Sequence, residues 1–286
     1  MVDEASIFIV GAKGQLGTAL LGKYPNARSA DIEEMDITDK NSVLNYDWSK
    51  IKIIINAAGY TNVDGAETPE GRIAAWKVNA QAVSCLAEIA INNDITLVHI
   101  STDYVFDGTK ENHKEDESFS PLGVYAQTKA AGDIVAAVVP SCYIIRTSWV
   151  MGSGTNFVRS IYDLGQKGVN PKVVADQFGR PTFTVELVRV IDHLLSTKPE
   201  YGTYNASNGG DIVSWADIAR QVYKDAGYFS LKVSDTTANE YFAGKLSSPR
   251  PVYSGLDLSK LEATGFMPRD WRDNLTDYIK KELNKS

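Results

Sequence analysis

The chain has 286 residues, of which 43% are hydrophobic and 23% charged, a composition typical of a soluble globular protein with one large or two modest domains. Its formal net charge of −7 argues against a nucleic-acid or anionic-membrane partner. No apolar run approaches the roughly 20 residues of a membrane span, and the start of the chain lacks a signal pattern. We therefore expect a cytoplasmic protein.

The cysteines and histidines are few and give no sign of a disulfide framework or a zinc site. Cys85 and Cys142 are unclustered, which is typical of reduced cytosolic thiols rather than of a disulfide framework. The three histidines are scattered and none has a spacing suited to zinc. The sequence therefore predicts no metal site.

The first 150 residues alternate short apolar runs with longer amphipathic ones, the pattern of a parallel sheet covered by helices. We expect strands at 6–10, at a segment ending near Ala30 and Asp31, and at 52–56, 95–100 and 143–147. We expect helices from about Gln15, over 69–92 and over 124–139.

After Trp149 the alternation of strand-like and helix-like segments becomes less regular. We expect helices at 156–166 and 185–195, strands at 172–175 and 203–206, and a helix ending at Gly227 that a Ser214/Asp217 capping box opens. The rest, up to a closing helix at 270–283, suits a small lobe built from loops.

The predicted fold class is α/β, a Rossmann-type doubly wound parallel sheet with a smaller C-terminal substrate lobe. The dinucleotide-binding domain is expected to comprise 1–150 and about 184–206. The substrate-binding lobe would then comprise 151–183 and 207–286.

Three glycines, Gly11, Gly14 and Gly17, stand between the first strand and the first helix. There a tight turn, close approach of a pyrophosphate and helix–strand contact all favour glycine, and the helix N-terminus attracts phosphate. Asp31, 20 residues past Gly11, can accept from adenosine ribose hydroxyls, which favours NAD; the alternative is a solvated turn carboxylate. Lys13 could equally meet a 2′-phosphate, so the cofactor is expected to be NADH or NADPH.

Two further segments follow strand ends. Asp36 and Ile37 are placed to meet the adenine, and Asp39 is a plausible helix cap. The segment 56–61, Asn-Ala-Ala-Gly-Tyr-Thr, leaves the third strand at the edge that borders the ligand crevice in an open α/β sheet. Its small residues would let the backbone approach the cofactor.

Of four Tyr-x-x-x-Lys sequences, only Tyr125/Lys129 opens a long helical stretch. Ser101 and Thr102 leave the fourth strand at the same sheet edge. We expect Tyr125 to deliver a proton to a substrate carbonyl while Thr102, the better candidate of the two hydroxyls, donates a hydrogen bond to it. Lys129 near Tyr125 would lower the tyrosine pKa. The alternative for Thr102 is a bond to the local backbone.

Six segments in the same order carry a family resemblance: 11–17, 56–67, 101–108, 125–129, 146–150 and 176–182. The sequences Ser-Thr-Asp-Tyr-Val-Phe and Asp-Gln-Phe-Gly-Arg-Pro-Thr are the more telling, since many dehydrogenases share the glycine loop. The chain resembles the dTDP-4-dehydrorhamnose reductases, which are extended short-chain dehydrogenases/reductases. The likeness covers nearly the whole chain and thins after about residue 230.

The resemblance implies reduction, by NADH or NADPH, of the C4 ketone of a dTDP-linked 4-keto-6-deoxy sugar to give dTDP-L-rhamnose. It implies that Tyr125 is the proton donor, that Lys129 holds the nicotinamide ribose and that Thr102 polarises the ketone. The implied sugar-binding residues are Thr61, Val63, Thr102, Asp103 and Trp149, the last with core packing as its alternative. The implied cofactor-binding residues are Gly11, Gly14, Gln15, Leu16, Gly17, Asp31, Asp36, Ile37, Gly59, Tyr60, Thr61, Tyr125 and Lys129.

Two departures from the family pattern stand out. Many members have Glu, associated with a divalent ion at a dimer contact, where this chain has Ala19. The family's Arg-Pro-x-Asn-Ser is here Arg250-Pro-Val-Tyr253-Ser, so the roles of Arg250 and Tyr253 stay open. Monomer and homodimer both remain possible, as does membership of a longer fusion protein.

Two other classes of function remain alternatives. One is a non-catalytic regulatory relative that binds the cofactor. The other is a nucleotide-sugar epimerase or dehydratase of the same fold, which would retain the oxidised cofactor through its cycle.

Overall fold

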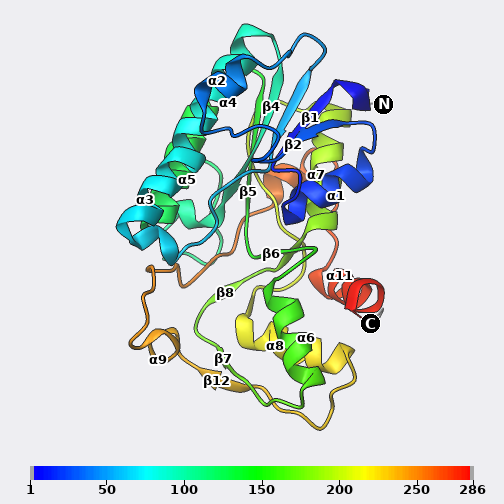
Figure 1. Ribbon diagram of the computed structural model, residues 1–286. Helices are drawn as coiled ribbons and strands as arrows, with labels where there is room; N and C mark the ends of the chain where they lie inside the picture. The colour runs from blue at the N-terminus through cyan, green and yellow to red at the C-terminus, as the bar shows by residue number, and fades with distance from the viewer. Residues whose placement is uncertain (1–2, 284–286) are drawn as a thin grey trace.

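The computed structural model describes residues 3–283, and it consists of a sheet-based half above a smaller, mainly helical lobe (Figure 1). Six parallel strands form the central sheet, in the spatial order β2 (Arg28–Ala30), β1 (Ile7–Val10), β3 (Ile53–Asn56), β4 (Thr96–Thr102), β5 (Cys142–Thr147) and β10 (Gly202–Asn205). The chain runs outward from β1 in one direction to β2 and in the other to β3. A doubly wound sheet binds its ligand at such a reversal, between the carboxyl ends of β1 and β3.

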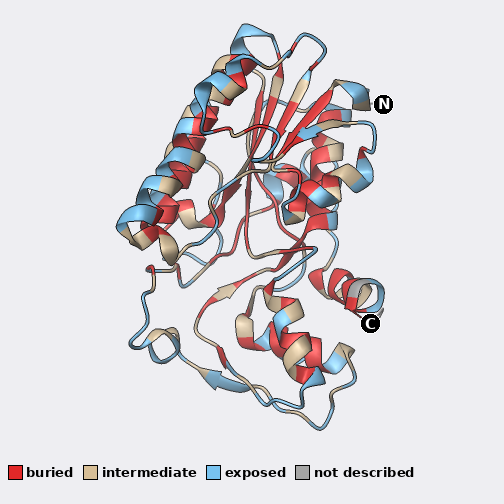
Figure 2. Cartoon of the chain, in the orientation of Figure 1, coloured by how far each residue is buried: buried red, intermediate tan, exposed pale blue. Residues whose placement is uncertain are grey.

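Helices cover both faces of this sheet. One face carries α2 (Lys40–Leu44), α3 (Pro69–Trp76), α4 (Ala82–Asn92) and α5 (Val124–Ala136), and the other carries α1 (Gln15–Lys23) and α7 (Thr184–Thr197), as Figure 1 shows. The strands are buried on both sides (Figure 2), as expected for a parallel sheet inside an α/β fold. The predicted α/β fold class is confirmed.

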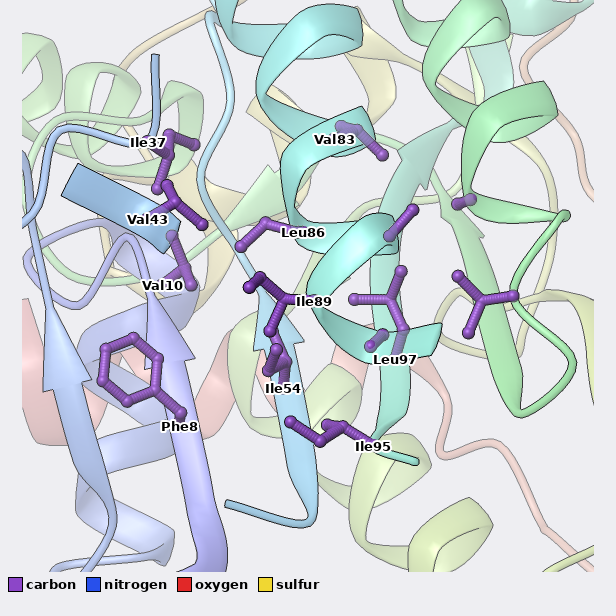
Figure 3. Packing of buried hydrophobic residues seen from close by; sticks show 14 of the residues in the cluster. Phe8, Val10, Ile37, Val43, Ile54, Val83, Leu86, Ile89, Ile95 and Leu97 are labelled. Carbon is purple, nitrogen blue, oxygen red and sulfur yellow. The ribbon is translucent and has the colours of Figure 1, made fainter. Parts of the chain in front are cut away.

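Alternate side chains of each strand enter two different cores. Phe8 and Val10 of β1 point to the α2–α5 side, whereas Ile7 and Ile9 pack against α1 and α7. Figure 3 shows the first of these cores, where strand residues meet the inner faces of α4 and α2; it includes Phe8, Val10, Ile37, Val43, Ile54, Val83, Leu86, Ile89, Ile95 and Leu97. This packing fixes the strand ends that carry the site.

The helix expected over 69–92 is interrupted. A π-turn at Lys77–Gln81 separates α3 from α4. The Asn79 side chain points inward from this turn and is 1% exposed, where it bonds the Tyr60 backbone and the Thr128 hydroxyl. A helix with regular spacing would present an apolar residue to the sheet here, so a buried polar contact accompanies the break.

The lobe has its own hydrophobic core, formed by α6 (Phe157–Gln166), α8 (Trp215–Asp225) and α11 (Trp271–Tyr278), the last continued by a π-turn at Ile279–Leu283. The predicted capping box at Ser214 and Asp217 is confirmed, with both reciprocal bonds present. Three two-stranded ladders complete this part of the chain: β6 (Val150–Met151) with β9 (Thr182–Phe183), β8 (Phe178–Gly179) with β11 (Val213–Ser214), and β7 (Lys172–Val174) with β12 (Ser234–Thr236).

The closing helix expected at 270–283 is present as α11, but the expectation that loops build the segment between Gly227 and that helix was wrong. Short helices α9 (Ala238–Phe242) and α10 (Ser259–Glu262) form there, and β12 pairs with β7. The α9 capping box of Thr237 and Glu240 stabilises a helix too short to show apolar periodicity. β10 pairs with β5, and α7 packs in the same core as α1.

Candidate active site

The glycine-rich loop joins β1 to α1 in a conformation that only glycine allows. Gly11 has a φ of +77°, and a Cβ there would approach the Ala58 backbone nitrogen to 2.7 Å. A Cβ on Gly17 would overlap the Gly11 carbonyl oxygen. These two positions bring the loop, the β3 end and the first turn of α1 into direct contact, and they leave the α1 N-terminus open for phosphate.

A cleft of about 470 Å³ lies where β1 and β3 diverge. Residues that follow β1, β2 and β3 line this cleft, together with Val78 of the π-turn after α3. Seven of the lining residues belong to the predicted cofactor set: Gly11, Gly14, Asp31, Asp36, Ile37, Gly59 and Tyr60. The structure therefore brings most of the predicted cofactor set to one cleft. The Asp36 carboxylate also accepts bonds from the Thr38 amide and hydroxyl.

The far end of this cleft is acidic. The Asp31 carboxylate accepts bonds from the Lys13 amide (2.7 Å) and the Ile32 amide (2.9 Å). The Lys13 ammonium pairs with Glu33 and Glu34, and these hydrogen bonds raise the pKa of Lys13. Neither glutamate belonged to the predicted set. They pair with the cation that, on the sequence alone, could equally have met a 2′-phosphate.

Three other predicted cofactor residues have structural partners in the protein. The Gln15 side-chain oxygen accepts from the Gly152 amide at 2.7 Å, which ties the glycine loop to the lobe. Leu16 is buried in the core shared with α7, and Gly17 packs on Gly11. These contacts hold the glycine loop in place, and the cofactor contacts of the three residues stay predictions.

The predicted catalytic hydroxyls lie together. Ser101 and Thr102 end β4 rather than follow it, and Tyr125 is the second residue of α5. The Thr102 hydroxyl bonds the Tyr125 phenol, donates to Asp103 Oδ1 at 3.0 Å and accepts from the Tyr104 amide at 3.2 Å. Thr102 therefore contacts both the candidate acid and a buried carboxyl.

Burial dominates the electrostatics of this cluster. It raises the pKa of Tyr125 well above its usual value, with the Thr102 bond acting against it. It also raises the pKa of Asp103 to about 7, and hydrogen bonds from the Ser254 and Thr102 hydroxyls offset only part of that. At neutral pH the protein alone keeps the Tyr125 phenol protonated, and about half of the Asp103 carboxyls carry a proton.

Burial is the largest influence on the Tyr125 pKa in the protein alone, and the effect predicted for Lys129 stays a prediction. The Lys129 ammonium donates to the Ile100 carbonyl at 2.6 Å, one residue from Ser101 at the end of β4. Burial lowers the pKa of Lys129 itself to about 8, and the Asp133 carboxylate acts in the opposite direction. The Ile100 bond thus ties Lys129 of α5 to the end of β4.

A buried polar network that the sequence did not single out supports this arrangement. Asp133, one helical turn beyond Lys129, accepts from Arg146 Nε at 2.9 Å. Burial lowers the pKa of His99, which contacts Asn56 and lies 4.0 Å from Asp133. Asn79, also missed, bridges the β3 loop to α5 through Tyr60 and Thr128. The one available signal was a polar residue on the apolar face of the 69–92 helix.

The predicted sugar-binding residues fall into two groups. Val63 packs with Tyr60 and Tyr104 against Tyr125, whose ring lies 5.9 Å from that of Tyr104, while Thr61 is exposed beside them. Trp149 instead joins the lobe, where its ring stacks on Trp215 at 3.8 Å. Trp149 has a φ of +46°, a strained conformation for a non-glycine residue at the junction of the two halves.

Residues 3–283 contain no group of three or more His, Cys, Asp or Glu side chains arranged to hold a metal ion. None of their helices is both long and apolar enough to cross a bilayer.

Solved structures share this arrangement. A dTDP-4-dehydrorhamnose reductase from Clostridium acetobutylicum superposes with a TM-score of 0.89 at 36% identity, over 98% of this chain and 99% of the other. The same enzyme from Bacillus anthracis, solved in complex with NADP, gives a TM-score of 0.87 at 32% identity, over 96% and 98% of the two chains. The protein is thereby an NAD(P)-dependent oxidoreductase of the Rossmann type.

Within this class of oxidoreductases, the chain can be assigned to one family. The model described as RmlD substrate binding domain matches residues 5–284, and the chain belongs to this family. A dTDP-4-dehydrorhamnose reductase from Aggregatibacter actinomycetemcomitans is 37% identical over 94% of this chain and 96% of its own length. The resemblance read from the motifs is confirmed.

Proposed function

We propose that the protein reduces the C4 ketone of dTDP-4-dehydro-6-deoxy-L-mannose (dTDP-4-dehydrorhamnose) to the alcohol of dTDP-L-rhamnose, using NADH or NADPH. The observation that carries the proposal is the meeting of the Tyr125 and Thr102 hydroxyls at the carboxyl edge of the sheet that also borders the β1/β3 cleft. The curated relatives and solved structures that share the fold over nearly their full length bear the name of this reductase.

The residues of the cleft fit a dinucleotide. Gly11 has no side chain where a Cβ would press on Ala58, so a pyrophosphate can approach the backbone, and Asp31 can accept from a ribose hydroxyl. The coenzyme supplies the hydride when it is bound. We assign 1–150 and about 184–206 to this coenzyme domain, which the pairing of β10 with β5 and the packing of α7 on α1 support.

Tyr125 is proposed as the proton donor. Its raised pKa keeps the phenol protonated at neutral pH, which is the form that donates a proton to the developing alkoxide. Thr102 polarises the ketone when its hydroxyl donates to the substrate instead of to Asp103. Lys129, with its pKa of about 8, is largely charged at pH 7 and would hold the nicotinamide ribose.

The sugar is proposed to lie between Tyr125 and the lobe. Val63 and Tyr104 give that space an apolar wall, which suits the methyl end of a 6-deoxy sugar, and Trp149 offers an aromatic face from the lobe. Asp103 is the buried polar partner for a sugar hydroxyl. The free Cys85 and Cys142 are compatible with the reducing cytoplasm in which we place the reaction.

The test is a steady-state assay of NADH and NADPH oxidation with dTDP-4-dehydrorhamnose beside a UDP-linked 4-keto sugar. We expect stoichiometric coenzyme consumption with the dTDP compound. Activity confined to the UDP compound would keep the reduction and overturn the rhamnose assignment. Tightly bound NAD with no net consumption would favour an epimerase or dehydratase, and coenzyme binding without turnover would favour a regulatory protein.

A further inference from the structure

A segment of the C-terminal lobe reaches the start of the helix that carries Tyr125. After α9 the chain runs up from the lobe towards α3, shown in orange in Figure 1, and there Ser248 contacts Glu67. We propose that Glu67, held by Ser248, caps α5 from a distant part of the chain and acts as a positioning residue for Tyr125. This inference rests on the proposed role of Tyr125 as proton donor.

The helix has no cap of its own. The first N–H groups of an α-helix have no partner within the helix, and a Ser, Thr, Asp or Asn side chain at the N-cap usually accepts from one of them. The N-cap of α5 is Gly123, which has no side chain to do so. Glu67 Oε1 accepts from the Val124 amide at 3.0 Å instead, from 57 residues upstream. Its negative charge at a helix N-terminus is also favourable.

The same oxygen anchors the lobe. Glu67 Oε1 accepts from the Ser248 hydroxyl at 2.7 Å, across 181 residues of sequence, and Ser248 is 5% exposed. The Asp64 carboxylate holds the segment at two further points, from the Ser248 amide at 2.9 Å and from Arg250 Nη2 at 2.8 Å. Arg250 Nη1 donates to the Ser248 carbonyl at 3.0 Å. Arg250, whose role the sequence left open, thus braces the contact.

Gly123 is required by this contact and not by its own backbone. Its φ of −115° and ψ of 175° are extended values that any residue adopts. A Cβ there, however, would overlap the Ser248 hydroxyl and lie 2.9 Å from Glu67 Oε1. Glycine at the N-cap therefore provides no side-chain cap of its own, but it leaves the space that Glu67 and Ser248 occupy.

The consequence for catalysis follows from the position of Tyr125. It is the residue after Val124, so the bond that holds the Val124 amide fixes the first turn of α5 and with it the phenol relative to Thr102. A misplacement of about 1 Å at a reacting group can lower a rate roughly 100-fold. The lobe segment that contacts Glu67 therefore also sets the position of the acid.

The first experiment compares Glu67→Ala with Glu67→Gln. Gln keeps an oxygen that accepts from Val124 and Ser248, whereas Ala removes it. We expect kcat, normalised to NADH-binding sites, to fall about 10- to 100-fold in Glu67→Ala and to stay within about threefold in Glu67→Gln. The Kd of NADH, measured by fluorescence, should not change. Glu70→Ala, which removes an exposed acid from the same segment, is the control.

The second experiment tests whether Ser248 acts through Glu67. Ser248→Ala should lower kcat about threefold to tenfold, and Ser247→Ala should not. Because the two residues act through one contact, the double variant Glu67→Ala/Ser248→Ala should be no worse than Glu67→Ala alone. Gly123→Ala, whose Cβ would displace the Ser248 hydroxyl and crowd Glu67 Oε1, should lower kcat at least as much as Ser248→Ala.

Native kcat in Glu67→Ala would overturn the proposal, as would equal losses in the Ala and Gln variants or multiplicative losses in the double variant. If Glu67→Ala does not fold, Glu67→Gln and Ser248→Ala still decide, because native kcat in Ser248→Ala contradicts the coupling. Tyr125→Phe separates this proposal from the assigned reaction. An active Tyr125→Phe would refute the acid itself, whereas an inactive Tyr125→Phe beside a native Glu67→Ala would refute only the cap.

Discussion

The coenzyme half and the substrate lobe solve the same problem, holding a ligand at the sheet edge, in different ways. In the coenzyme half several defining contacts are local: Asp31 accepts from Lys13 across 18 residues, and Gly17 packs on Gly11. In the lobe the contacts link distant segments, such as Arg180 with Leu256 across 76 residues and Ser248 with Glu67 across 181. The coenzyme end is thus specified by a short motif and the substrate end by tertiary packing.

The largest effect is expected where the two halves meet, at Tyr125. Tyr125→Phe removes only the hydroxyl, so we expect kcat to fall by roughly two to four decades, the usual weight of general acid catalysis, with the fold and NADH affinity retained. Tyr241→Phe is the control, since Tyr241 also begins a Tyr-x-x-x-Lys sequence but is exposed and contacts Lys245. Near-native kcat in Tyr125→Phe would show that Tyr125 is not the proton donor.

The second prediction concerns Asp103, which contacts Thr102 from one half and Ser254 from the other. Its pKa is raised to about 7, so the native state keeps a proton that the unfolded state releases near pH 4. Its contribution to stability is therefore fully present below pH 4 and is lost as the pH rises through 7. Asp103→Asn abolishes this titration.

The measurement is urea unfolding of both proteins at pH 5 and pH 8. From pH 5 to pH 8 the free energy of unfolding of Asp103→Asn should rise relative to wild type by roughly 2–3 kcal/mol. Asp47→Asn, at an exposed position, is the control. A difference between Asp103→Asn and wild type that does not change with pH would show that the carboxyl is not buried as described.

The third prediction tests whether Trp149 of the lobe contributes to binding of the nucleotide sugar. Trp149→Ala should raise KM for the nucleotide sugar about tenfold and lower kcat less, because it removes a contact made in the ground state as well as the transition state. Trp76→Ala, at an exposed position on α3, should leave both parameters unchanged. A change confined to kcat would indicate that the Trp149–Trp215 stack supports the fold rather than the sugar.

The smallest effect is expected at the acidic end of the cleft. Asp31 should let NADH serve at least as well as NADPH, and Asp31→Ala should improve relative NADPH use. Glu33→Gln/Glu34→Gln should free Lys13 for a 2′-phosphate and improve the NADPH/NADH ratio of kcat/KM a few-fold, less so in high salt, because these charges are exposed.

The control for that double variant removes the same charge elsewhere, as Glu70→Gln/Glu88→Gln. Direct binding of adenosine 2′,5′-bisphosphate against AMP should shift in the same direction as the kinetic ratio. If neither ratio moves in any of these variants, the acidic end does not choose the coenzyme.

The same contrast explains what could be predicted from the sequence. The apolar runs around Ile9 and Ile54 predict strands, and Gly11 with Asp31 predicts the cleft, because backbone periodicity and loop geometry are local properties. Glu67 was visible only as part of a motif, since its partners Val124 and Ser248 lie far along the chain. The pKa of Tyr125 could not be predicted, because burial depends on packing from every side.

The most direct test of the central claim follows the hydride. The protein is incubated with dTDP-4-dehydrorhamnose and NADH carrying deuterium at the transferable position, and the product is analysed by NMR and mass spectrometry. We predict one deuterium at C4 of dTDP-L-rhamnose for each NADH oxidised. Product without deuterium at C4, or NADH left unconsumed while the sugar changes, would contradict the assigned reaction.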